Sequence, residues 1–217
     1  MTPCYDNSYC KREELANALT HGLGAVLSLA GLVLLVVYAS LYGNAWHVTA
    51  CSIFGASMVL LYTFSTLYHS PFAEPTKSLL RKIDHAAIFV LIAGSYTPFV
   101  LLPLRGPWGW SLFGIIWGLA IPGVILKFWF TGRFKKLSTA LFLGMGWLIV
   151  IAARPMLREV PTGALVLLAA GGLSYSVGAI FYMWRRLPYN HALWHLFVLG
   201  GTTCHFFAVF SYLIPGT

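Results

Sequence analysis

The 217-residue chain is 59% hydrophobic and only 9% charged, whereas soluble domains carry about a quarter charged residues. This composition excludes an ordinary water-soluble domain and predicts an integral membrane protein. The formal net charge is +8, from 14 Lys and Arg residues against 6 Asp and Glu residues. The basic residues occur in short runs between apolar stretches, so the charge indicates membrane orientation rather than nucleic-acid binding, which needs a continuous basic surface.

The first eighteen residues are polar and contain three acidic residues, so they do not resemble a cleavable signal peptide. We therefore expect residues 1–18 to form a cytoplasmic N-terminal segment. Cys4 and Cys10 lie in this segment and could pair or bind a metal, although unpaired thiols are the simpler expectation.

Seven segments are apolar over roughly the 20 residues that a helix needs to cross a bilayer core. Helices are expected because backbone polar groups must be hydrogen bonded internally in the bilayer. The predicted spans are residues 19–40, 47–68, 84–104, 108–128, 136–153, 163–184 and 191–214. The fifth is the shortest. The predicted fold is an all-α integral membrane protein, with one seven-helix transmembrane domain over residues 19–214 and an external tail over residues 215–217.

The loops between these spans differ in their content of basic residues. One side of the membrane receives eleven of them: Lys11, Arg12, Lys77, Arg81, Lys82, Lys127, Arg133, Lys135, Lys136, Arg185 and Arg186. The other side receives only Arg105, Arg154 and Arg158. The positive-inside rule then predicts a cytoplasmic N-terminus, and seven spans place the C-terminus outside.

Ionisable side chains at the edges of spans are energetically costly, so each is a functional candidate. His69 ends the second predicted span, Asp84 and His85 begin the third, and His191 and His195 begin the seventh. All five lie at the predicted cytoplasmic ends of their helices. Three helices thus offer metal ligands or catalytic groups at one membrane depth.

The spacing within these helices favours a metal site. His191 and His195 are four residues apart, which places them about 40° apart around a helix and one turn along it. Ser65 precedes His69 by the same spacing, so it lies on the same face one turn deeper. Together with His69, the two histidines form a three-nitrogen set that can hold zinc and leave one coordination position open, as in catalytic sites. Histidine also suits copper, iron and nickel.

Asp84 has three candidate roles. Its carboxylate could orient and deprotonate a water at the metal, ligate the metal, or hydrogen bond to a ligand histidine. His85 is rotated by about 100° from Asp84 around the helix, so we expect it to face elsewhere. The alternative to metal binding is that these histidines only anchor the helices at the membrane interface, where an amphipathic ring is favourable.

Two further sets of polar residues lie outside this group. His205 follows His195 by ten residues, about 15 Å of helix, so it cannot bind the same ion. We expect it to be a buried histidine that hydrogen bonds to a neighbouring helix, and the alternative is that it belongs to a polar pathway leading from the site. Glu14, Asn17 and His21 fall within about 60° of one another on the first helix. This stripe could face the bundle and close its cytoplasmic mouth, or serve only as a helix cap.

These residues carry a resemblance to the haemolysin III family of bacterial membrane proteins, which is similar to the progestin and adipoQ receptors and, more distantly, to alkaline ceramidases. The matching motifs are Glu14-x-x-Asn17-x-x-Thr20-His21, Ser65-x-x-x-His69, Asp84-His85, His191-x-x-Trp194-His195 and His205-Phe206, with Gly200 between the last two.

The resemblance implies a seven-helix protein of the bacterial inner membrane with a cytoplasmic N-terminus. It also implies that His69, His191 and His195 hold zinc, and that Asp84 and Ser65 attend a water on the metal, as their counterparts do in adiponectin receptors. The long N-terminal region of those receptors has no counterpart here, so a protein-hormone ligand is not expected.

The leading functional hypothesis is therefore a zinc-dependent hydrolase of a lipid amide or ester, with a role in membrane-lipid homeostasis and with membrane lipids as its partners. A non-enzymatic sensor of membrane state with structural zinc is the alternative. A channel or cytolysin is the third hypothesis, although a compact bundle with an internal metal site does not resemble a pore.

Overall fold

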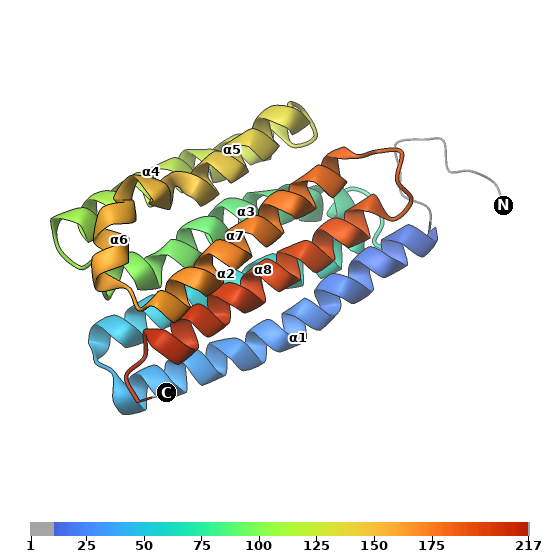
Figure 1. Ribbon diagram of the computed structural model, residues 1–217. Coiled ribbons are helices and arrows are strands. Elements are labelled where there is room, and N and C mark those ends of the chain that lie inside the picture. Colours follow the sequence, from blue (N-terminus) through green and yellow to red (C-terminus); the bar gives the residue numbers. More distant parts are fainter. Residues whose placement is uncertain (1–10, 217) are drawn as a thin grey trace.

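The computed structural model describes residues 11–216, which form a bundle of antiparallel helices (Figure 1). Seven helical stretches in this described part are long and apolar enough to cross a membrane, which confirms the predicted all-helical, seven-span fold. The elements are α1 (Lys11–Tyr42), α2 (Ala45–His69), α3 (Thr76–Leu101), α4 (Pro107–Phe130), α5 (Lys135–Trp147), the 3₁₀-helix η1 (Leu148–Ala152), α6 (Ala153–Glu159), α7 (Thr162–Met183) and α8 (Asn190–Tyr212).

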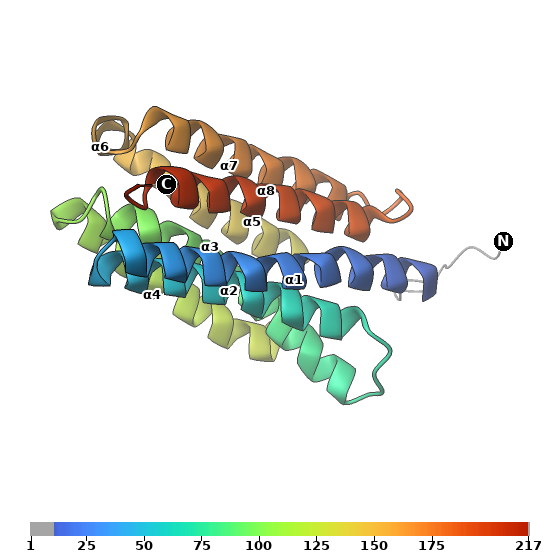
Figure 2. The ribbon, with the colours of Figure 1, turned by 90° about the horizontal axis from the view of Figure 1, so that it is seen from below.

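Helix α3 is the most buried of the seven spans and lies at the centre of the bundle. Most neighbours in space are neighbours in sequence, with α1 against α2, α2 against α3, α3 against α4 and α7 against α8. The contact between α1 and α8 closes the bundle on the other side (Figure 2). Helix α5 makes far fewer contacts, with α3 and α7. The bundle is therefore tightly packed except around α5.

Small residues allow α7 and α8 to approach each other closely. A Cβ atom at Gly178 would lie 2.6 Å from the Cβ atom of Phe197, and one at Gly201 would lie 2.8 Å from the Tyr175 ring. Helix packing inside a bilayer depends on such close approach because lipid removes most of the hydrophobic drive for association.

The start of α1 and the connections 70–75, 131–134 and 184–189 all lie at one end of the bundle, at the right of Figure 1. Eleven of the 14 basic residues lie in or beside these segments, so we call this end the basic end. The basic-residue count predicts that it faces the cytoplasm.

Two helices begin earlier than their predicted spans. Helix α1 begins at Lys11 rather than at residue 19, and α3 begins at Thr76 rather than at residue 84. Both extensions carry charged residues, among them Glu14 and Lys77, which a search for apolar stretches leaves out. The expectation that Asp84 begins the third helix is therefore wrong. Asp84 lies about two turns inside α3.

The fifth span is broken into α5, η1 and α6, which together run over Lys135–Glu159. The prediction that it is the shortest span is therefore wrong. The Tyr96 hydroxyl of α3 accepts a hydrogen bond from the Ile149 backbone N–H at 2.9 Å, and it lies 2.7 Å from the Met145 carbonyl oxygen and 2.8 Å from that of Gly146. Because an irregular backbone at membrane depth needs partners inside the protein, Tyr96 stabilises the break.

Candidate metal centre

Three buried histidines meet at the basic end of the bundle. His69 is the last residue of α2, and His191 and His195 lie in the first two turns of α8. Each offers one nitrogen, and these three atoms lie within 4.8 Å of one another. The Nε2 atoms of His69 and His191 are 3.2 Å apart. Within residues 11–216, these histidines are the one group of His, Cys, Asp and Glu side chains that could hold a metal ion together.

Side chains of α1 contact the Nδ1 atom of His69 and orient its ring. The Nδ1 atom of His69 lies 3.2 Å from Glu14 Oε2 and 3.4 Å from Asn17 Nδ2. Glu14 is itself held by Lys77, whose Nζ donates to the same oxygen at 3.2 Å. Because an ionised carboxylate only accepts hydrogen bonds, the shorter contact with Glu14 assigns the proton to Nδ1 and the lone pair to Nε2. The Asn17 amide nitrogen can only donate, so in this tautomer it is a neighbour of Nδ1 and not its hydrogen-bond partner.

The same helix orients His195. Its Nδ1 atom lies 3.2 Å from the Asn17 backbone carbonyl oxygen and 3.2 Å from Thr20 Oγ1. The carbonyl can only accept, so Nδ1 carries the proton and Nε2 is again the nitrogen with the lone pair. Ligand histidines typically donate their second N–H to a carboxylate or carbonyl in this way. The residues present therefore fit a divalent metal such as zinc, with the Nε2 lone pairs of His69 and His195 and one nitrogen of His191 as its ligands.

The polar stripe on α1 thus faces the bundle, as one of the two sequence-based alternatives held. Asn17 and His21 are buried, and Glu14 contacts His69. Ser65 also lies in this region and is buried, with its Oγ atom 2.7 Å from His21 Nδ1. The His21 ring stacks on the His195 ring, with centroids 3.5 Å apart and an angle of 11° between the planes.

Asp84 is buried on α3, and its Oδ2 atom lies 3.0 Å from His85 Nδ1. The expectation that His85 faces away from Asp84 is wrong. Two neighbouring side chains on a helix can still meet, because their torsion angles bring the short carboxylate and the ring nitrogen toward each other. Asp84 does not belong to the group of potential ligands formed by the three histidines.

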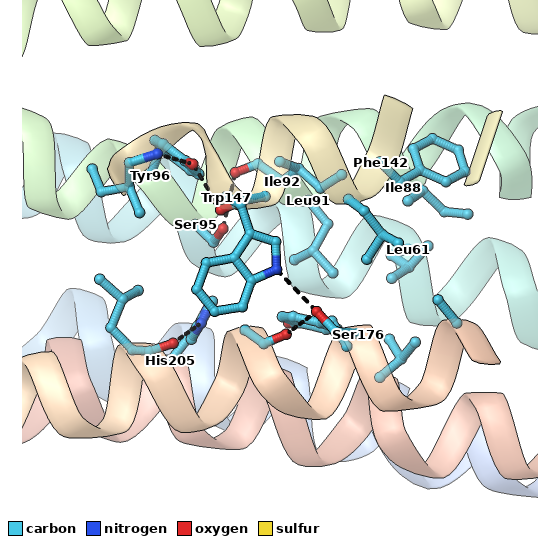
Figure 3. A pocket seen from close by; sticks show the side chains of 18 of the residues that line it. Leu61, Ile88, Leu91, Ile92, Ser95, Tyr96, Phe142, Trp147, Ser176 and His205 are labelled. Carbon is cyan, nitrogen blue, oxygen red and sulfur yellow. Dashed lines mark hydrogen bonds between the residues drawn. The ribbon is translucent and has the colours of Figure 1, made fainter. Parts of the chain in front are cut away.

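A cavity of about 340 Å³ extends from this centre into the bundle. One end is polar, and it is lined by His21, Ser65, Asp84, His85, His191 and His195. The walls formed by α2, α3, α5 and α7 are mostly apolar and include Leu61, Ile88, Leu91, Ile92 and Phe142 (Figure 3). Trp147 borders the cavity, and its indole N–H donates to Ser176 Oγ across from α5 to α7 at 2.9 Å. The arrangement can place a polar group at the histidines and an apolar chain along the bundle.

His205 lines the same cavity, away from the three histidines. Its Nε2 atom lies 3.3 Å from the Leu168 carbonyl oxygen of α7. The prediction of a buried histidine that hydrogen bonds to a neighbouring helix is confirmed.

Sequence reasoning missed the roles of Thr20 and Lys77, which support His195 and Glu14. The spacing of Thr20, three residues after Asn17 and next to His21, was an available signal. Lys77 could not be found in this way, because its contact with Glu14 depends on the unpredicted first turn of α3.

Comparison with known proteins shows which family the chain is similar to. A family model described as Haemolysin-III related matches residues 9–206. Hemolysin-3 of Bacillus cereus is 52% identical over 204 residues, which cover 94% of this chain and 93% of that protein. The Hemolysin-3 homolog of Bacillus subtilis (strain 168) is 50% identical, over 94% of this chain and 95% of that protein.

A more distant similarity extends to animals. The human monocyte to macrophage differentiation factor is 31% identical over 209 residues, which cover 93% of this chain and 84% of that protein. No solved structure matches the chain.

Proposed function

We propose that this chain, which belongs to the haemolysin III family, is a zinc-dependent hydrolase of a lipid amide or ester that acts in membrane-lipid homeostasis. With seven spans and close bacterial relatives, it is a multi-pass protein of the inner membrane. One observation carries the proposal. Two of the three grouped histidines, His191 and His195, line a largely apolar cavity whose polar end also holds Asp84 and Ser65.

The number of protein ligands supports a catalytic rather than a closed structural metal. Structural zinc sites have four protein ligands, whereas catalytic sites have three and keep a fourth position for water or substrate. The group found within residues 11–216 has three members, His69, His191 and His195. Bound zinc would supply Lewis-acid activation of the substrate carbonyl and of the attacking water.

Asp84 is the proposed proton-transfer group. Its carboxylate lines the cavity beside the histidines without being one of the grouped ligands, so it can accept the proton of the attacking water. The water oxygen bonds to the carbonyl carbon, the C–N or C–O bond breaks, and Asp84 returns the proton to the leaving nitrogen or oxygen. A protonated His85 ring would form an ion pair with Asp84, since its Nδ1 atom lies 3.0 Å from Asp84 Oδ2.

Ser65 is the proposed substrate-orienting group. Its hydroxyl is paired with His21 Nδ1 at 2.7 Å, which fixes the direction of its remaining hydrogen-bonding capacity. When His21 Nδ1 carries the proton and donates to Ser65 Oγ, the Ser65 hydroxyl can donate to the carbonyl oxygen of a substrate at the polar end of the cavity, which Ser65 lines.

The cavity suits a lipid chain. Its volume of about 340 Å³ lies within the usual range of small-molecule sites, which is roughly 300–1,000 Å³. Its walls are mostly apolar, and α5 on one side packs only loosely against α3 and α7. We infer that substrate reaches the cavity sideways from the bilayer, between α5 and α7, where Trp147 pairs with Ser176.

One observation favours the alternative of a membrane-state sensor with structural zinc. A metal held by His69, His191 and His195 would join α2 to α8, and these two helices share few backbone contacts. Zinc binding could therefore change the packing of the bundle without any reaction.

The Asp84→Asn substitution separates these two functions. In a hydrolase, Asp84→Asn should keep the fold and the zinc yet lose activity by roughly 10²–10⁴-fold, the usual contribution of a general base. In a sensor, the same zinc-loaded variant should function normally. Zinc content and lipid turnover are measured on one preparation, with lipid profiles of deletion cells that express each form.

Glu159→Gln is the matched control, because it makes the same carboxylate-to-amide change at an exposed position on α6. It should behave as the wild type in both measurements. Full restoration of the deletion strain by zinc-replete Asp84→Asn protein would argue against hydrolysis.

A further inference from the structure

His205 is a polar residue in the apolar part of the cavity. Its side chain lines the cavity and is 7% exposed. It follows His195 on α8 by ten residues, which corresponds to about 15 Å along the helix axis. A group bound at His205 would therefore be far from the candidate metal centre yet within the same cavity.

The hydrogen-bonding state of His205 follows from its one partner. The Leu168 carbonyl oxygen, 3.3 Å from Nε2, can only accept, so Nε2 carries the proton. In the neutral ring, Nδ1 then bears a lone pair and acts as an acceptor. Within the part of the chain that the structure describes, this buried Nδ1 atom has no hydrogen-bond partner. Burial of an unpaired acceptor is unfavourable, so a donor from outside the protein would stabilise the site.

The fold makes room for His205 at this position. A Cβ atom at Gly171 of α7 would lie 2.5 Å from His205 Nε2, so only glycine allows the ring to come so close to α7. On another side, the Tyr175 ring packs edge-on against His205, with centroids 5.4 Å apart. These contacts hold the ring in a fixed orientation.

Donors near the cavity are already engaged with other groups. The Tyr175 hydroxyl pairs with Thr202 Oγ1 at 2.9 Å, and the Tyr62 hydroxyl donates to the same Thr202 oxygen at 2.8 Å. The Trp147 indole N–H donates to Ser176 (Figure 3). These hydroxyl and indole groups therefore pair with Thr202 or Ser176 rather than with His205.

We propose that His205 Nδ1 accepts a hydrogen bond from a hydroxyl group on the lipid chain that occupies the cavity. The site would thereby favour chains that carry a hydroxyl far from their polar head. This inference rests on the proposed function only in taking a lipid chain as the occupant, with its head at the three histidines. A buried water is the other donor that such a site can take, and the test distinguishes the two.

The experiment measures binding rather than turnover, on the purified full-length protein in lipid nanodiscs. The probes are stearate and 12-hydroxystearate, which differ by one hydroxyl in the distal half of the chain. Wild-type protein should bind 12-hydroxystearate about 2- to 10-fold more tightly than stearate, the gain expected from one net hydrogen bond. The His205→Phe variant should bind both probes equally. The Ser95→Ala variant is the control, because it removes another hydroxyl from the same cavity, one that within residues 11–216 bonds only to the Ile92 carbonyl oxygen of its own helix, and it should keep the preference.

Equal binding of the two probes by the wild type would overturn the proposal and favour a water at His205. A preference that survives in His205→Phe would also overturn it. Because the wild-type comparison needs no variant, it decides the question even where His205→Phe does not fold. A protein that binds neither probe would exclude a lipid chain as the occupant. If the wild type shows the hydroxyl preference but hydrolyses no lipid, the proposed reaction is refuted and the inference about His205 stands.

Discussion

Replacement of Glu14 by Gln tests how the candidate metal centre is oriented. The Glu14 carboxylate lies 3.2 Å from His69 Nδ1 and 3.2 Å from Lys77 Nζ. Loss of a hydrogen-bonded partner behind a ligand histidine typically weakens metal binding by about 10–100-fold. The Glu14 side chain is 18% exposed, and its carboxylate also forms an ion pair with Lys77. We therefore expect a loss near the lower limit, about 10-fold or about 1.4 kcal/mol.

Zinc affinity is measured by competition with a chelator of known affinity. The matched control is Glu13→Gln, because Glu13 lies one residue away and accepts from the Tyr189 backbone N–H rather than from a histidine. That variant should bind zinc as the wild type does. Unchanged affinity in Glu14→Gln, or an equal loss in Glu13→Gln, would show that α1 does not orient His69 as described.

Three further predictions concern the fold and the metal. Tyr96→Phe should lower the free energy of unfolding by about 1–3 kcal/mol, because the Ile149 N–H and a nearby carbonyl lose their partner; detergent unfolding curves measure it, and an unchanged midpoint would contradict the role of Tyr96. A periplasmic phosphatase fused after Lys136 should be inactive, since Lys136 lies in the first turn of α5 at the basic end, and an active fusion would reverse the predicted orientation. Removal of metal by a chelator should lower the melting temperature, and added zinc should restore it; the same temperature with and without metal would argue against a metal that joins α2 to α8.

Much of the fold could be predicted because a bilayer restricts what a sequence can do. An apolar stretch of the right length must form a helix, so the number of spans followed from hydropathy alone. The helix ends were less predictable. The first turns of α1 and α3 carry Glu14 and Lys77, whose charges interrupt the apolar signal although they pair with each other.

The candidate site likewise has features that the sequence predicts and features that it does not. Helical spacing predicted that His191 and His195 share a face, and that His69 and Ser65 do so on α2. The contacts that orient these rings depend on how α1 packs against α2 and α8. The Asn17 backbone carbonyl that accepts from His195 is one example, since no residue type marks a carbonyl as a partner. His85 shows a further limit, because the angle between neighbouring positions on a helix does not determine where flexible side chains meet.

The most direct test of the account is metal analysis of the purified protein beside its His191→Ala His195→Ala double variant. The account predicts about one zinc per chain in the wild type, because three histidine nitrogens lie within 4.8 Å of one another. It predicts loss of most of that zinc in the double variant, since His69 alone cannot hold the ion. His205→Ala, which changes a histidine of the same helix outside the centre, should keep the metal. Stoichiometric zinc in the double variant would contradict the proposed metal centre and the reaction that depends on it.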